Sequence, residues 1–175
     1  MCSSDLGNGL TDFEDPACCP QGQTFAMSVT RGRLRPHGPT SKLVLRSLLA
    51  SHGLEGVNPL KEDVFLQIRQ VGGAEILCAK APATAFRRTH KAFKFRDRKH
   101  QIASARGVQK MKVKVRRRKG GVRFRAFGRK VEMQTPARGT LQVTVGFHDP
   151  AGGPNMCSSQ LQEFRTGRKG RLLAP

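Results

Sequence analysis

The chain has 175 residues, 37% of them hydrophobic, which predicts about one domain with a modest core. Its 32 Lys and Arg residues against 12 Asp and Glu residues give a formal net charge of +20, which predicts attraction to polyanions. With 19 Gly and 10 Pro residues long helices are not expected, and no apolar run reaches the roughly 18 residues of a membrane span.

The first residues do not read as native protein sequence. Residues 1–6, MCSSDL, are what the end of a common sequencing adapter encodes, GTG TGC TCT TCC GAT CTN, with GTG taken as the start codon. We therefore expect residues 1–6 to be artefactual and the native N-terminus to be missing, with chance occurrence as the alternative. On this hypothesis the lack of a signal peptide at the start carries no weight.

Residues 7–19, GNGLTDFEDPACC, resemble the end of the aspartate-rich loop DNDGDGLTDxxDPxC of many bacterial secreted proteins. That loop is similar to the calcium loops of thrombospondin type 3 repeats and dockerins. The resemblance implies that Asn8 and Asp12 would offer side-chain oxygens to calcium, and Leu10 its carbonyl oxygen. Two leading aspartates of the motif fall within residues 1–6, so calcium is expected only in the untruncated protein. The alternative is an acidic, turn-rich linker.

From residue 24 onward the chain shows short stretches of apolar and polar alternation, separated by segments rich in Gly and Pro. This spacing predicts an all-β fold, an antiparallel β-sandwich of about 7–9 short strands, Ig-like or jelly-roll-like. Residues 44–51 could equally form one short helix, which periodicity does not settle. The expected strands are residues 24–30, 42–47, 63–71, 75–79, 91–96, 108–118, 122–127 and 140–148, with a terminal strand near 160–165.

The same pattern predicts three parts of the chain. Residues 1–22 are expected to be a truncated acidic loop and linker, and residues 23–166 the β-sandwich domain. Residues 167–175 contain few apolar side chains and are expected to form a mobile basic tail. The oligomeric state does not follow from these features.

Most of the positive charge lies in one quarter of the chain, because residues 86–131 contain 19 Lys or Arg residues and one acid, Asp97. Within it, residues 110–127, KMKVKVRRRKGGVRFRAF, alternate apolar and cationic side chains in two runs joined by Gly120 and Gly121. Because successive side chains of a strand point to opposite faces, these runs predict a hairpin with one apolar and one cationic face. Its expected polyanion-binding residues are Lys110, Lys112, Lys114, Arg116, Arg117, Arg118, Lys119, Arg123 and Arg125.

Four cysteines remain when Cys2, in the adapter-like residues, is set aside: Cys18, Cys19, Cys78 and Cys157. Four thiols allow three pairings, which the sequence does not distinguish. The preferred hypothesis is a disulfide between Cys78 and Cys157 across the sandwich, because each lies at or after the end of a predicted strand. The alternatives are free buried cysteines in a reducing cytosol, or a zinc site, although neither the cysteines nor the histidines show ligand spacing.

Two stretches, residues 28–48 and 92–133, resemble the repeating modules of uncharacterised bacterial secreted proteins. In those modules a KLxLK strand precedes a WKFKD-like strand, a KVKxKxKKGKVxFKxxG hairpin and a closing strand with a cysteine. FKFRD and GGVRFR stand in the expected places here, and Cys157 is where the closing cysteine would be. Tryptophan is absent and residues 100–107 are inserted. The resemblance implies a fold and an exported location, and no known activity.

No catalytic pattern stands out in the sequence. GxSxG, P-loop, HExxH and GxGxxG motifs do not occur, and no carboxylate pair is placed as an acid and a base. We therefore expect a protein that is not an enzyme and needs no cofactor. The lack of Tyr and Trp also disfavours binding of single-stranded nucleic acid by base stacking.

The sequence thus predicts a non-catalytic, exported structural or adhesive module at the cell envelope or outside the cell. Its cationic face would dock on anionic polymers, whether polysaccharide, lipid headgroups or nucleic acid. The alternative is a cytoplasmic nucleic-acid-binding protein whose hairpin, residues 110–127, binds the phosphate backbone. A third interpretation is that the cations only keep the sheet soluble and block edge pairing.

Overall fold

The computed structural model describes residues 24–49, 54, 56–71, 75–116, 120–136, 139–151 and 156–174. They form strands joined by turns and three short 3₁₀ helices, and among them no helix is long and apolar enough to cross a bilayer. The elements are β1 (Thr24–Arg35), β2 (Lys42–Leu49), β3 (Asp63–Gln70), β4 (Glu75–Ala81), η1 (Ala83–Ala85), β5 (Phe86–Thr89), β6 (Ala92–Arg96), η2 (Ala103–Ala105), β7 (Val108–Val115), β8 (Val122–Arg129), β9 (Gly139–His148), β10 (Met156–Thr166), η3 (Arg168–Gly170) and β11 (Leu172–Ala174).

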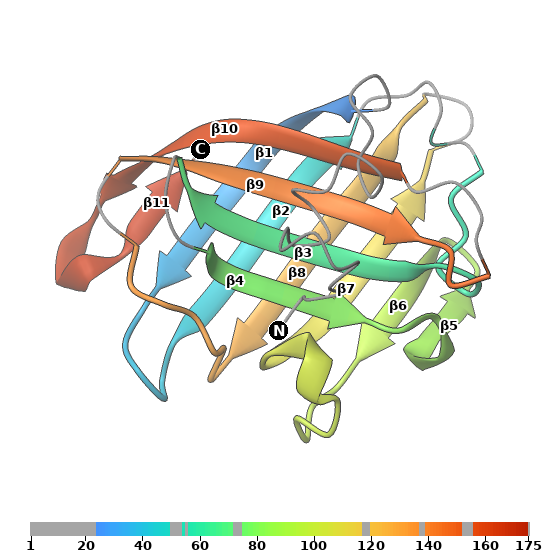
Figure 1. The fold of residues 1–175 in the computed structure, drawn as a ribbon, viewed down its shortest axis with the longest axis horizontal. Helices are drawn as coiled ribbons and strands as arrows, with labels where there is room; N and C mark the ends of the chain where they lie inside the picture. Colours follow the sequence, from blue (N-terminus) through green and yellow to red (C-terminus); the bar gives the residue numbers. More distant parts are fainter. Residues whose placement is uncertain are drawn as a thin grey trace, which may run out of the picture.

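All eleven strands belong to one sheet, in the order β4-β3-β9-β10-β11-β1-β2-β8-β7-β6-β5. The pairings are antiparallel except between the start of β1 and β10, which run parallel. The sheet folds over itself, so that β9, β3 and β4 lie across β2, β8 and β7 (Figure 1). It is nearly closed as a barrel, with β4 and β5 as its two edges.

The all-β prediction is confirmed, but the strands are more numerous than the 7–9 expected and form one continuous sheet. The region considered as a possible helix is strand β2 as far as Leu49. Two strands were not expected, β5 and β11, because four and three residues are too few to show a period. The segment predicted to be a mobile tail contains β11, whose Leu172 and Leu173 pair with both β10 and β1.

The hydrophobic core fills the inside of the folded sheet. Leu43 and Leu45 from β2 and Val143 from β9 are fully buried there. The rings of Phe95 and Phe124 are also fully buried and belong to this core. Burial of each such side chain contributes about 1.5–3 kcal/mol, so the inner face supplies most of the stabilisation of the sheet.

A bulge in β1 controls which of its residues face outward. The register with β2 shifts between Val29 and Arg31, so that Thr30 and Arg31 lie together opposite Arg46. Because of this extra residue Val29 and Leu34 both point into the core, although five positions separate them. The bulge also places Arg31 on the outer face, directly beside Arg46.

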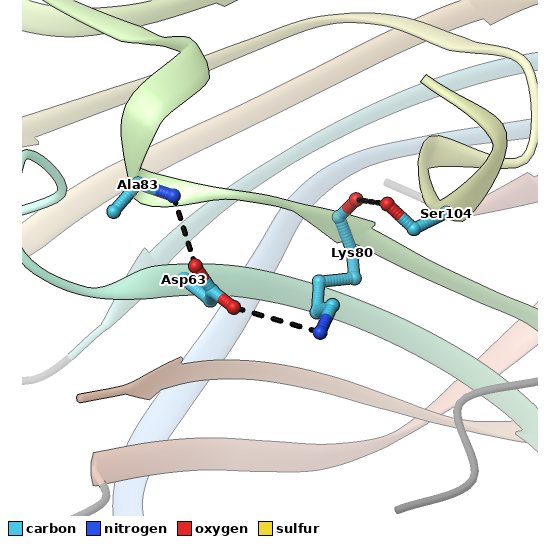
Figure 2. Close-up of polar contacts among 4 residues, drawn as sticks. All are labelled: Asp63, Lys80, Ala83 and Ser104. Atoms are coloured by element: carbon cyan, nitrogen blue, oxygen red, sulfur yellow. Dashed lines mark hydrogen bonds and ion pairs between the residues drawn. The ribbon is translucent and has the colours of Figure 1, made fainter. Parts of the chain in front are cut away.

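Contacts between β3, β4 and the loop between β6 and β7 hold the edge at β4 (Figure 2). The Asp63 carboxylate accepts a hydrogen bond from the Ala83 N–H at 2.9 Å and lies 3.6 Å from Lys80 Nζ. On the other side the Ser104 hydroxyl, in η2, donates to the Lys80 carbonyl oxygen at 3.0 Å. The edge strand is thereby tied to the β6–β7 side of the sheet, which protects it from pairing with another chain.

A close approach of β8 to the start of β7 requires glycine at Gly128. A Cβ there would collide with Val131 Cγ2 and lie 2.8 Å from the carbonyl oxygen of Gly107. We expect Gly128→Ala to lower the free energy of unfolding by about 1–3 kcal/mol in urea denaturation. Gly56→Ala is the control, since no atom lies within 4 Å of its added methyl group. Equal stability of the two variants would contradict this account.

Candidate polyanion-binding face

Charge is distributed unevenly over the sheet. The six neighbouring strands β1, β2, β8, β7, β6 and β5 contain no Asp or Glu. Three cations each on β1, β7 and β8 and two each on β2, β5 and β6 make 15 Lys and Arg residues. The other five strands balance three acids against three bases, namely Asp63, Glu75 and Glu163 against Arg69, Lys80 and Arg165.

The predicted hairpin is formed by β7 and β8. Met111 and Val113 are buried on its inner side, whereas Lys112 and Lys114 lie on the outer side, so one apolar and one cationic face are confirmed. At its end the Arg116 N–H donates to the Gly121 carbonyl oxygen at 2.9 Å, and Gly120 and Gly121 have φ of 66° and 79°. Of the predicted binding residues, Lys110, Lys112, Lys114, Arg116, Arg123 and Arg125 are described, and Arg117, Arg118 and Lys119 lie outside the described residues.

The pairing register extends this cationic face far beyond the hairpin. Arg125 of β8 lies opposite Lys112 of β7, and its other neighbour is Arg46 of β2. The series continues from Arg46 to Arg31, and from Lys112 to Lys94 and then Arg87. One cation thus stands on each of six neighbouring strands, and since strands lie about 4.8 Å apart the series is about 24 Å long. We call it the charge row: Arg31, Arg46, Arg125, Lys112, Lys94 and Arg87.

Four members of the charge row were missed from the sequence, namely Arg31, Arg46, Arg87 and Lys94. They lie on β1, β2, β5 and β6, and the one closest in sequence to the hairpin strands, Lys94, is 14 positions before Val108, the first residue of β7. Alternation within each strand shows that they point outward, but only cross-strand pairing aligns them with Lys112.

The rows on either side of the charge row are interrupted by apolar residues. On one side Val44 and Phe127 stand between Arg33 and Lys110, and on the other Leu48 precedes Arg123. Lys110 Nζ and Arg129 Cζ lie 5.4 and 5.8 Å from the centre of the Phe127 ring, so cations already cover it. Two shallow hollows of about 220 and 280 Å³ flank these side chains, lined by Arg33, Leu34, Arg35, Lys42, Val44 and Arg171, and by Arg98, Gln109, Lys110, Phe127 and Arg129.

The cations of the charge row repel one another. Partial burial and then the charges of Arg125, Lys94, Lys114 and Arg123 lower the pKa of Lys112 below its ordinary value. In the described part of the chain no carboxylate forms an ion pair with any member of the row; the ion pairs there are Lys80–Asp63 and Arg106–Glu132. Like charges opposite one another destabilise a sheet, so a bound anion would reduce the repulsion between these cations.

Asp97, the single acid of the basic quarter, does not neutralise this face. It is buried, and its two carboxylate oxygens accept hydrogen bonds from the N–H groups of Gln101 and Ile102, each at 2.9 Å. Its carboxylate thus faces the backbone of the loop between β6 and β7 and not the cations of the outer face. The outer face of the six strands therefore keeps its full positive charge.

The expected disulfide between Cys78 and Cys157 is wrong as a direct pair. Cys78 lies on β4 and Cys157 on β10, and β3 and β9 run between them. Three strand spacings place their Cα atoms about 14 Å apart or more, whereas a disulfide joins Cα atoms about 4.4–6.8 Å apart. Both cysteines are buried, at 4% and 2% exposure.

The predicted calcium ligands Asn8, Leu10 and Asp12 lie outside the described residues. Within the described residues no three His, Cys, Asp or Glu side chains come together in a group that could hold a metal ion.

No protein-family model, no curated protein and no solved structure matches this chain. The resemblance to modules of bacterial secreted proteins stays a prediction from the sequence.

Repulsion within the charge row predicts that Lys112→Gln stabilises the protein. At neutral pH and low salt we expect the free energy of unfolding to rise by about 0.2–1 kcal/mol, the usual size of a cross-strand charge effect. The pKa of Lys112 is lowered in the folded state, which means that its positive charge destabilises the fold. This destabilisation is fully present below the lowered pKa and fades as pH rises towards the ordinary lysine pKa of about 10.4.

The measurement is chemical denaturation of the wild type and Lys112→Gln at neutral and alkaline pH. The difference in unfolding free energy should shrink with rising pH and with added salt. Lys61→Gln serves as the control, because Lys61 is exposed and lies before β3, away from the row. A Lys112→Gln variant less stable than the wild type at neutral pH would contradict the repulsion.

Proposed function

We propose that this protein is a non-catalytic, exported structural or adhesive module that docks on anionic polymers of the cell envelope. The docking surface is the outer face of β1, β2, β8, β7, β6 and β5. The observation that carries the proposal is the charge row, six cations in register with no acid on any of the six strands.

Solubility alone does not account for this arrangement. A soluble surface normally mixes charges of both signs, and an edge strand needs only a few cations to prevent pairing. Here the cations cross the middle of the sheet, on strands β2, β8 and β7 that are already paired on both sides. A row of like charges that lowers stability is more readily explained by binding, since an anion would compensate the repulsion.

Polyanion binding by such a face has a simple physical basis. Each Lys or Arg that pairs with an anionic group releases counterions from the polymer, and Arg adds paired hydrogen bonds to carboxylate or phosphate. Stacking of nucleic-acid bases is not favoured here, because Phe127, the aromatic ring that lies among the outward cations of β7 and β8, is covered by two of those cations. A nucleic acid would therefore be bound through its phosphates alone.

We also infer that the folded sheet is a sandwich-like secreted module, Ig-like or jelly-roll-like in its packing. Two halves of the sheet lie across each other in Figure 1, with a common core between them. The location we infer is extracellular or in the cell envelope, with a cytoplasmic nucleic-acid-binding protein as the alternative.

Salt-dependent retention tests the docking surface. We expect the full chain to be retained at physiological ionic strength on beads carrying an acidic polysaccharide, and to elute as salt is raised. Replacing Lys112, Lys114, Arg123 and Arg125 by Glu should abolish retention, because it reverses the charge at the centre of the face.

The matched control reverses four exposed cations away from this centre, Lys61, Lys91, Arg165 and Arg168. Both variants change the net charge equally, so a specific face predicts that the control is still retained. Equal loss of retention in the two variants, or no retention of the wild type, would refute the proposed surface. Retention on duplex DNA but not on polysaccharide or anionic vesicles would favour the cytoplasmic alternative.

Export predicts oxidised cysteines. Since Cys78 and Cys157 are too far apart to pair directly, we expect each to be joined to Cys18 or Cys19. Peptide mapping without reductant, on protein prepared in an oxidising compartment, should show these two linkages. Free thiols at all four cysteines would remove the support for an exported protein, and a Cys78–Cys157 peptide would contradict the strand order.

A further inference from the structure

The charge row gives the cationic face a direction. Across the strands one cation follows another at each of six strands, about 4.8 Å apart. Along a strand outward residues recur only about every 7 Å, and on β8 Phe127 interrupts the series between Arg125 and Arg129. Lys110, Lys112 and Lys114 also follow one another along β7, but they are only three and stand at this wider spacing. The longest and most closely spaced line of positive charge therefore crosses the strands, at right angles to the β7–β8 hairpin.

A ligand that uses every cation of the row must carry negative charges about as close together as neighbouring strands. A polysaccharide of uronic acids carries one carboxylate on every sugar ring, and each ring advances the chain by about the separation of two strands. An extended nucleic-acid strand has a longer repeat between phosphates. The phosphates of a duplex wind around a cylinder, so a row across a sheet would meet only some of them.

The side chains of the row and its borders fit the same ligand. Four of the six cations are Arg, whose planar fork forms two parallel hydrogen bonds with a carboxylate. On β2 the apolar side chains of Val44 and Leu48 lie on the same face on either side of Arg46, and both are half-buried. They offer a surface to the C–H groups of a sugar ring, while Arg46 reaches its carboxylate.

We propose that the charge row binds a linear uronic-acid polysaccharide that lies across the six strands, with one carboxylate at each cation. This inference rests on the proposed docking function and adds to it the class of polymer and its direction. The ligand would touch β1 and β5, the two ends of the row, as well as the central hairpin.

The test compares two variants of the full chain that lose the same number of charges. The row variant carries Arg31→Gln, Arg46→Gln, Arg87→Gln and Lys94→Gln. The off-row variant carries Arg33→Gln, Lys42→Gln, Arg96→Gln and Arg129→Gln, four exposed cations of the same face. The probes are fluorescently labelled oligogalacturonates of graded length, with duplex DNA and phosphatidylglycerol vesicles measured in parallel.

We expect the row variant to bind polygalacturonate about 30-fold more weakly than the wild type, as four lost surface ion pairs would give. The off-row variant should lose less than about threefold, since only the general attraction of the face is reduced. Affinity of the wild type should rise with oligomer length and level off near six sugars, one for each strand of the row.

Each other outcome overturns the inference in a distinguishable way. Equal losses in the two variants would show that the face acts only through its total charge, which leaves the proposed function standing. The same holds if Lys110→Gln, Lys114→Gln, Arg123→Gln and Arg129→Gln together cause the larger loss, because the polymer would then follow the hairpin. Binding of duplex DNA without polygalacturonate would identify a nucleic-acid ligand, and failure of the wild type to bind any probe would refute the proposed function as well.

Folding of the variants is checked by their thermal midpoints. Both sets of substitutions remove repelling charges, so midpoints at or above that of the wild type are expected. If the row variant melts lower, the double variant Arg46→Gln and Lys94→Gln replaces it. A loss of about fivefold is then expected for polygalacturonate, and an undiminished affinity would refute the row.

Discussion

The antiparallel pairing of β2 with β8 is the constraint on which the rest of this structure depends. Eight residue pairs, from Lys42 opposite Arg129 to Leu49 opposite Val122, join the two strands without a shift in register. Because side chains alternate with period two, a slip of one residue would turn Leu43 and Leu45 to the surface and the cations into the core. The pairing that builds the core therefore also aligns the charge row.

Stability and binding make opposing demands on these central strands. On the inner side Leu45 and Phe124 are fully buried and stabilise the sheet, while on the outer side Arg46 and Arg125 lie opposite each other and repel. Burial of two large apolar side chains contributes more than one exposed pair of like charges costs. The core thus allows the face to remain fully cationic in the absence of a ligand.

The two parts of the sheet differ in chemistry as well as in position. Strands β3, β4, β9 and β10 balance their charges, and Asp63 and Lys80 pair with each other next to the covered edge at β4. In the basic quarter the carboxylate of the one acid, Asp97, accepts hydrogen bonds from backbone N–H groups of its own loop. Both arrangements keep carboxylates away from the charge row, so an approaching polyanion meets no repulsion there.

Alternation along the chain was sufficient to predict an all-β protein and the β7–β8 hairpin with its two faces, because these depend on neighbours within one or two strands. It could not reveal β5 or β11, whose three or four residues show no period. It also misled on the cysteines, since strand order decides that β3 and β9 separate Cys78 from Cys157.

The sequence by itself determined that the chain is strongly basic, rich in strands, and cationic on one side of each strand. Only the tertiary structure decided that Arg31, Arg46, Lys94 and Arg87 join Lys112 and Arg125 in one row. The physical reason is that cross-strand neighbours are set by hydrogen-bond register, and in β1 by a bulge, between segments that are far apart in the chain. A charge pattern within a strand shows that a face is positive, and the register of the whole sheet decides the direction in which that charge runs.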